Sequence, residues 1–250
     1  SASLTDANLN RSLDYATRAY ALGQQTHDET GLVIALHNLG KCYTRLGRGE
    51  TAMENLLEAL EICQKMADEK LVGQTYKLIG NSYYFRDETA MALQYYKRAL
   101  LVNKKIKDEE TEADLKNNIA LVYLSIIKLD SALVNLTESA AAYERLNKPG
   151  KLANSLLNIG EVKARSQLYD EAIEYYKRAL DINQSTGLTL QEGFALNNIA
   201  GSLISLKKYT EAEEYGTQAL DIALKEKFQP LLLNVYQNMY RLNKENNNFS

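Results

Sequence analysis

Few residues in this sequence could act as nucleophiles, general bases or metal ligands. It contains two histidines, His27 and His37, and two cysteines, Cys42 and Cys63. Catalytic and metal sites need several such groups at characteristic spacings, and no GxSxG, HExxH, Walker or GxGxxG pattern is present. We therefore expect no enzyme activity, no cofactor and no metal, with both cysteines as small buried residues on helices.

Asparagines recur along the chain at a regular spacing. One column of the sequence holds Asn38, Asn118, Asn158, Asn198 and Asn238, whose numbers differ by forty or by a multiple of forty. An amide both donates and accepts hydrogen bonds, so these side chains suit either the backbone of a ligand or a neighbouring repeat. Because the column is so regular, we favour the structural role, bonding between repeats.

The spacing belongs to a repeat that runs through the whole chain. The string YYKRAL occurs at Tyr95–Leu100 and Tyr175–Leu180, and NNIA occurs at Asn117–Ala120 and Asn197–Ala200, with the same offset in both cases. The offset is eighty residues, and half of it, forty residues, is the period of the repeat. A column of small residues holds Gly40, Gly80, Ala120, Gly160 and Ala200, and a column of alanine holds Ala52, Ala92, Ala132, Ala172 and Ala212. Small residues at fixed positions let neighbouring helices approach closely.

Each forty-residue unit has the pattern of two helices. In the fourth unit, Leu152, Leu156 and Ile159 recur at three- and four-residue steps, which predicts an apolar stripe on a first helix. A short polar connector follows, and then a second amphipathic helix. Pro149 and Pro230 both fall between units. We predict an all-α fold, a right-handed α-solenoid of antiparallel helix pairs with about 12 helices.

The pattern predicts one solenoid over residues 1–250. Residues 1–24 form an N-terminal second helix, 31–226 form five full repeats, and 230–250 form a truncated sixth repeat with its first helix only. Phe249 falls in the column where a further second helix would begin. We therefore expect a fragment of a longer protein, with a homodimer through the truncated ends as one possibility. Gly216 stands in a column that holds large residues in the second helices of the other full repeats. We expect the side chain of Tyr240 to fill the space that the glycine leaves.

The motif Leu/Ile-Gly…Tyr…Ala…Ala-Leu resembles the tetratricopeptide repeat. The residues that carry the likeness in the first two units are Leu39-Gly40, Tyr43, Ala52, Leu56 and Ala59, then Ile79-Gly80, Tyr83, Ala92, Tyr96 and Ala99. The usual unit is shorter, at about 34 residues, and the longer unit here is similar to those of bacterial sensor and regulator proteins and of cell-polarity adaptors. The resemblance implies that the first helices line a concave groove for a protein or peptide.

Transferring the family's groove positions onto this sequence gives the candidate binding residues. They are His37, Lys41, Lys77, Asn81, Tyr84, Asn117, Leu121, Leu124, Leu157, Glu161, Asn197 and Ile204. Lysines suit a carboxylate, amides suit a peptide backbone, and the leucines form an apolar stretch.

The resemblance favours a non-catalytic scaffold that binds a protein or peptide. Two alternatives stay open: the sensor domain of a bacterial signalling or transcriptional regulator whose output module is missing, and a small-molecule or glycan binder. With 29 basic and 32 acidic residues, the charge gives no reason to expect nucleic acid or an anionic membrane as a partner of this fragment. We expect a cytoplasmic location, with the periplasm as the alternative because the chain begins without Met and a targeting segment could precede it.

Overall fold

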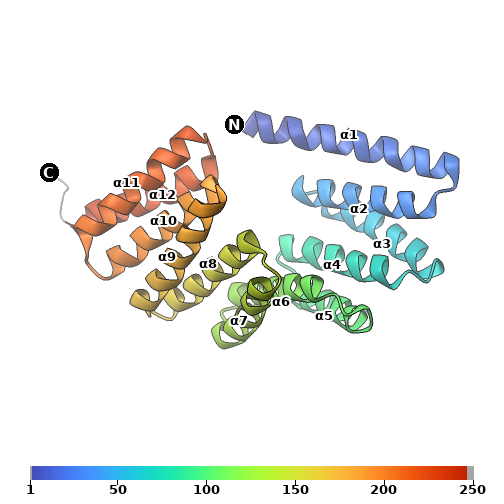
Figure 1. Ribbon diagram of the computed structural model, residues 1–250. Coiled ribbons are helices and arrows are strands. Elements are labelled where there is room, and N and C mark those ends of the chain that lie inside the picture. The colour runs from blue at the N-terminus through green and yellow to red at the C-terminus, as the bar shows by residue number, and fades with distance from the viewer. Residues whose placement is uncertain (1, 247–250) are drawn as a thin grey trace. The chain divides into compact units, whose positions relative to one another are not determined.

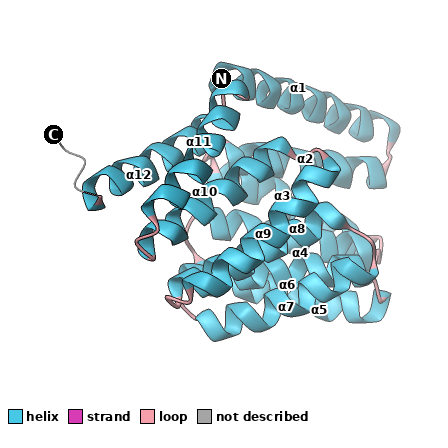
Figure 2. Cartoon of the chain, turned by 60° about the vertical axis from the view of Figure 1, so that its left-hand side comes forward, coloured by secondary structure: helices cyan, strands magenta, loops and turns pink. Residues whose placement is uncertain are grey.

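A computed structural model describes residues 2–246, with side chains from residue 8 onward. Every regular element in this range is an α-helix, and the connections are short turns (Figures 1 and 2). The helices form two compact units, one ending at Ile126 and the other beginning at Ile127. This boundary falls inside the third predicted repeat, between its two helices. Whether residues 1–250 form one continuous solenoid therefore stays a prediction.

Each unit contains six helices. The N-terminal unit is built from α1 (Ala2–Thr26), α2 (Glu29–Arg45), α3 (Gly49–Lys65), α4 (Glu69–Phe85), α5 (Thr89–Ile106) and α6 (Glu109–Ser125). The C-terminal unit is built from α7 (Leu129–Arg145), α8 (Pro149–Arg165), α9 (Tyr169–Thr186), α10 (Thr189–Ser205), α11 (Tyr209–Lys225) and α12 (Gln229–Glu245). Twelve helices and no strand within residues 2–246 confirm the predicted all-α fold of helical repeats.

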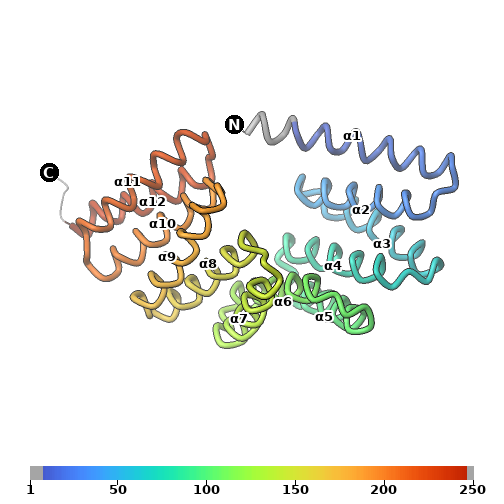
Figure 3. Tube along the Cα trace, viewed as in Figure 1, coloured from blue at the N-terminus to red at the C-terminus, as the bar shows by residue number. Residues whose placement is uncertain are grey.

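The turns between helices recur at a regular interval along the chain (Figure 3). Each contains one residue with positive φ, and these residues are His27, Gly47, Ala67, Asp87, Lys107, Ile127, Asn147, Gln167, Gly187, Lys207 and Lys227. A residue with left-handed backbone conformation after the last helical turn lets the chain reverse its direction. The backbone N–H groups of the turn then bond to the last carbonyls of the helix. One helix and the short turn after it thus make half of the forty-residue unit.

Helix starts differ between the two units. In the N-terminal unit the first helix of each repeat begins with an aspartate whose side chain accepts a backbone N–H three residues later. These caps are Asp28, Asp68 and Asp108. The matching positions of the C-terminal unit are Lys148, Leu188 and Phe228, which make no side-chain cap bond. Pro149 and Pro230 lie in the first turns of α8 and α12, where proline is tolerated.

The column of small residues sits where two helices touch. A Cβ added at Gly40 would come 2.6 Å from Leu56, and one added at Gly80 would come 2.6 Å from the ring of Tyr96. The alanine column is buried as well, with exposures of 0–1% at Ala52, Ala92, Ala132, Ala172 and Ala212. The predicted close approach of the helices through these two columns is confirmed.

The space at Gly216 is not filled by Tyr240. No heavy atom outside its own helix backbone and chain neighbours lies within 4 Å of a Cβ built on Gly216, and Tyr240 is 62% exposed. The expectation was wrong because residue 240 occupies the column that faces a following second helix rather than α11. The position predicted for Phe249 lies outside the described residues.

Among the described residues, no helix combines the length and the apolar character that crossing a bilayer requires.

Candidate functional site

A polar groove of about 380 Å³ opens in the C-terminal unit. Helices α8, α9, α10 and α12 contribute its walls. The lining residues are Glu161, Ala164, Arg165, Tyr169, Tyr176, Asn197, Asn198, Gly201, Ser202, Ser205, Asn234, Gln237, Asn238 and Arg241. Five of them are amides, which can pair with both N–H and C=O groups of a ligand.

Arg241 of α12 is held in the groove by two hydrogen bonds. Its Nη2 donates to Ser205 Oγ of α10 at 2.7 Å, and its Nε donates to Glu245 Oε1 at 2.9 Å. A guanidinium has five N–H donors in a fixed plane. The remaining N–H groups of Arg241 can donate to an acceptor such as a peptide carbonyl or a carboxylate. The bonds to Ser205 and Glu245 fix the orientation of the guanidinium before a ligand binds.

Asn197 positions another amide rather than meeting a ligand itself. It is only 4% exposed, and both its backbone O and its Oδ1 accept from Asn238 Nδ2 at 3.0 Å. The backbone comes close here because residue 201 is glycine, since a Cβ at that position would lie 3.2 Å from Asn238 Nδ2. Asn238 is thereby fixed with its remaining polar groups at the groove wall.

The other wall of the groove carries a charged pair and a neutral phenol. Arg165 Nε donates to Glu161 Oε1 at 2.6 Å along α8. Burial, and secondly the Glu161 carboxylate, raise the pKa of Tyr176. The phenol therefore stays protonated at physiological pH, and at 1% exposed it supports the wall from inside.

Three amides reach further into solvent. Asn198 is half-buried, while Asn234 and Gln237 are exposed. Such side chains can rotate to match a donor or an acceptor on a ligand. The two guanidinium groups on the lining, Arg165 and Arg241, are each paired with a carboxylate, Glu161 and Glu245, so the groove is polar without an excess of either charge.

The four predicted residues of the C-terminal unit have different environments. Glu161 and Asn197 line the groove. Leu157 is half-buried and packs against the apolar core of the unit. Ile204 is 1% exposed, so it supports the α10 wall from inside and cannot touch a ligand.

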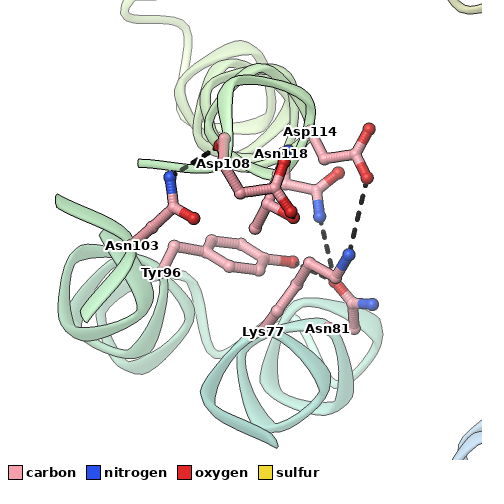
Figure 4. Close-up of polar contacts among 8 residues, drawn as sticks. Lys77, Asn81, Tyr96, Asn103, Asp108, Asp114 and Asn118 are labelled. Atoms are coloured by element: carbon pink, nitrogen blue, oxygen red, sulfur yellow. Dashed lines mark hydrogen bonds and ion pairs between the residues drawn. The ribbon is translucent and has the colours of Figure 1, made fainter. Parts of the chain in front are cut away.

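In the N-terminal unit, Lys77 and Asn81 of α4 bond to other residues of the chain (Figure 4). Lys77 Nζ lies 3.5 Å from Asp114 Oδ2 of α6. Asn81 Oδ1 accepts from the Tyr96 hydroxyl at 2.7 Å and from Asn118 Nδ2 at 3.2 Å. These contacts join α4 to α5 and α6. The bonds of Asn118 and Asn238 to the preceding repeat also confirm, for these two residues, the structural role predicted for the asparagine column.

His37 is buried, not presented to solvent. It is 5% exposed, and its Nε2 lies 2.7 Å from Thr75 Oγ1. Thr75 in turn lies 3.6 Å from Cys63 Sγ. Histidine, hydroxyl and thiol are the parts of a nucleophilic site, but Thr75 and Cys63 are 0% exposed, so no substrate can reach them. The set packs α2, α3 and α4 together.

The remaining predicted residues are spread over the inner helices of the N-terminal unit. Lys41 is exposed, with its Nζ 3.4 Å from Asn38 Oδ1. Tyr84 is half-buried beside the ring of Phe85. Asn117 and Leu121 are also half-buried, whereas Leu124 is 6% exposed. The twelve residues therefore do not form one described surface.

Sequence reasoning missed the α12 wall of the groove. Gln237 and Arg241 stand one repeat after Asn197 and Gly201, and two repeats after Leu157 and Glu161. Continuing the same columns into the truncated sixth repeat would have found them.

The two cysteines lie on α2 and α3 of the N-terminal unit. Cys42 and Cys63 are buried and unbridged, as expected for small apolar residues. Within the described residues, no cluster of three or more His, Cys, Asp or Glu side chains is suited to a metal ion.

Comparison with known proteins identifies the repeat. The family model of the tetratricopeptide repeat matches residues 31–105, 111–185 and 151–225. The transcriptional activator NprA of Geobacillus stearothermophilus is 29% identical over 133 residues, which are 53% of this chain and 32% of that protein. The chain spans a third or less of the curated relatives it matches.

Solved structures share the fold at low sequence identity. BtubC from P. vanneervenii superposes with a TM-score of 0.77 at 22% identity, over 88% of this chain and 92% of that chain. The apo form of the quorum sensor NprR from B. thuringiensis superposes with a TM-score of 0.73 at 17% identity, over 94% of this chain and 67% of that chain. Because the family model covers well over half of the sequence, the chain belongs to the tetratricopeptide repeat family.

Proposed function

We propose that the groove of the C-terminal unit binds an extended peptide or an extended segment of another protein, without catalysis. The observation that carries this proposal is the amide lining on α10 and α12, with Arg241 held by Ser205 and Glu245. An extended peptide has backbone N–H and C=O groups without internal partners, and side-chain amides satisfy both kinds. The volume of about 380 Å³ is within the range of ligand pockets.

The donors of Arg241 that Ser205 and Glu245 leave unused favour a ligand with an acidic side chain or a carboxylate near Arg241. A planar guanidinium can bind a carboxylate through two parallel hydrogen bonds. A free carboxy terminus offers the same group as an aspartate or glutamate. Peptides that bind are therefore expected to carry a negative group at one position and variable residues elsewhere.

The test is selection of peptides from a random library, followed by calorimetry with the tightest one. Gln237→Ala and Arg241→Ala are each expected to weaken binding by roughly tenfold, since hydrogen bonds to charged groups contribute about 1.5–3 kcal/mol and neutral ones about 1 kcal/mol. Asn154→Ala is the matched control, because Asn154 is an exposed amide of α8 that is absent from the groove lining. Equal affinity for all four proteins would exclude the groove as the binding site.

A second candidate is the sensor portion of a regulator. The relative in Geobacillus stearothermophilus is a transcriptional activator, and one structural neighbour is a quorum sensor. In that case the peptide in the groove would be a signal rather than a partner protein. The affinity for a short free peptide can be compared with the affinity for the same sequence within a folded protein. Equal affinities would favour the sensor.

A further inference from the structure

The second helices α3 and α5 of the N-terminal unit carry opposite charges. Helix α5 contains no aspartate or glutamate, whereas α3 contains one lysine among several glutamates. The basic residues of α5 are Lys97, Arg98, Lys104 and Lys105. The glutamates of α3 are Glu50, Glu54, Glu58 and Glu61. All of these side chains are exposed, so the two helices present a basic and an acidic surface.

An exposed leucine lies within each charged surface. Leu101 of α5 is 62% exposed, and Leu57 of α3 is 46% exposed. Residues three and four positions apart are neighbours on a helix, and the cations of α5 stand at these distances before and after Leu101. We call Leu101 with the four cations the basic patch, and Leu57 with the four glutamates the acidic patch.

The repeat column of Leu101 shows that the basic patch departs from the pattern of the chain. Three other second helices have an acidic residue in this column, namely Glu61, Asp181 and Asp221. The string YYKRAL, for example, is followed by Leu101 in α5 and by Asp181 in α9. A single exposed leucine is ordinary on a protein surface, but this one replaces a carboxylate. The cations of α5 therefore lack a counter-charge on their own helix.

Two of the four cations have partners elsewhere in the N-terminal unit. Lys105 reaches Glu69 of α4 at 2.6 Å. The Arg98 guanidinium lies 5.1 Å from the ring centre of Tyr95, which is a cation–π contact. Within residues 8–246, no side chain forms a hydrogen bond or an ion pair with Lys97 or Lys104. These two lysines can therefore bind the carboxylates of a partner.

The glutamates of the acidic patch do not neutralise the basic patch. Glu61 pairs with Lys65 of its own helix at 2.7 Å, and the two side chains are 68% and 71% exposed. Such surface pairs contribute little to stability. Glu58 accepts the hydroxyl of Tyr20 of α1 at 2.9 Å. Neither contact joins α3 to α5, so the acidic patch also remains open to a partner.

The two patches lie side by side and face the same side of the unit. Glu58 and Glu61 stand one repeat before Arg98 and Leu101, and stacked repeats present corresponding residues on the same face. Helices α3 and α5 also share one apolar cluster, to which Leu60 and Tyr95 contribute.

We propose that the N-terminal unit binds a second copy of the same chain, with the basic patch of each copy on the acidic patch of the other. A twofold axis that runs between the copies, parallel to α3 and α5, brings the two patches together twice. Such an interface is closed, so the assembly stops at a dimer. The proposal does not depend on the groove of the C-terminal unit.

Charge complementarity favours a second copy over a broad anionic surface. A membrane or a nucleic acid that reached the basic patch would also meet the glutamates of α3 beside it, and like charges repel. A second copy offers both charges in the matching order. It also offers an exposed leucine on each helix, Leu57 and Leu101.

The test is sedimentation equilibrium of the whole chain over a range of concentrations at low and at high salt. The wild type is expected to form a dimer that salt weakens. Lys97→Glu with Lys104→Glu, and Glu54→Lys with Glu61→Lys, are each expected to lower the association constant by roughly tenfold or more, because they place like charges opposite one another.

The control uses the second copy of the string YYKRAL. Lys177→Glu with Arg178→Glu reverses two exposed cations of α9 in the C-terminal unit, and it is expected to leave the dimer unchanged. All of the substituted side chains are exposed, so folding should be retained, which thermal unfolding of each variant checks.

Restored complementarity separates direct pairing of the patches from a general effect of charge. A chain with all four substitutions in α3 and α5 has exchanged patches, so it is expected to dimerise about as tightly as the wild type. An equal mixture of the two double variants is expected to form a one-to-one heterodimer, because both contacts then pair opposite charges.

Three results would overturn the proposal. A wild-type chain that stays monomeric at low salt would do so, even if it bound phosphatidylserine vesicles through Lys97 and Lys104, since the occupant of the basic patch would then be a membrane. A dimer that both reversals leave intact would indicate another interface. A four-substitution chain as weak as the double variants would show that the patches do not pair.

Discussion

His37 lies on the first helix of its repeat, in a column that the family uses for ligand contacts, yet Thr75 of α4 covers it at 2.7 Å. The sequence placed the histidine on the correct helix. It could not show that a hydroxyl from the next repeat would reach it, because that depends on how closely α2 and α4 pack. The same limit applies to Asn197, whose partner Asn238 lies 41 residues away.

We predict that acid destabilises the protein through His37. Burial, and secondly the Lys41 ammonium, lower the pKa of His37 from 6.5 to about 4. The folded state therefore holds the imidazole neutral, and this contribution is fully present above pH ~6.5. It is lost as the pH falls from there toward 4, by up to about 3 kcal/mol. Urea unfolding at several pH values measures it.

His37→Phe should flatten the dependence of the unfolding free energy on pH between 6.5 and 4. His27→Gln serves as the control, because His27 lies in the exposed turn before α2. An unchanged slope in His37→Phe would show that other groups cause the acid sensitivity.

Two glycine substitutions should have opposite effects on stability. Gly80→Ala forces a Cβ to 2.6 Å from the Tyr96 ring, and Tyr96 is 1% exposed, so we expect a loss of about 1–3 kcal/mol from overpacking. Gly216→Ala meets no heavy atom within 4 Å, so we expect a gain of about 0.5–1 kcal/mol from helix propensity. Thermal unfolding of both variants is the measurement, and effects of the same sign would contradict the packing described.

At the scale of the helices, the sequence predicted far more. The columns of glycine and alanine indicated the helix contacts, because small residues act through backbone approach. Pro149 and Pro230 were expected between units and lie in the first turns of α8 and α12, where proline is tolerated. The turn residues escaped notice. Only Gly47 and Gly187 among the eleven left-handed positions are glycine. No single residue type therefore marks the turns in the sequence.

The aspartate caps give a prediction for the helix starts. The side chain of Asp68 accepts the Leu71 N–H at 2.9 Å, so Asp68→Ala should lower the free energy of unfolding by about 1 kcal/mol. Arg48→Ala should change it by less than about 0.5 kcal/mol, because Arg48 precedes α3 without a side-chain cap bond. Equal losses in the two variants would indicate that the cap bond adds nothing.

For the molecule as a whole, the repeat explains where the groove lies. The inner columns that supply Asn197 and Glu161 also supply Gln237 and Arg241, so the groove extends onto α12. Its shape could not be predicted, because the depth of the groove depends on Gly201 and on how Asn238 packs beside it. The division into two units at Ile126 coincides with a change in one repeat column. The capping aspartates before it give way to residues that make no side-chain cap bond, Lys148, Leu188 and Phe228.

The proposed function requires the amides of the C-terminal groove to hold a bound peptide. It is tested by recording the side-chain amide resonances of asparagine and glutamine by NMR while the selected peptide is added. We predict shifts for Asn198, Asn234 and Gln237, with Asn154 unmoved. Saturated binding that leaves these three groove amides unshifted would contradict the account, whichever other residues respond.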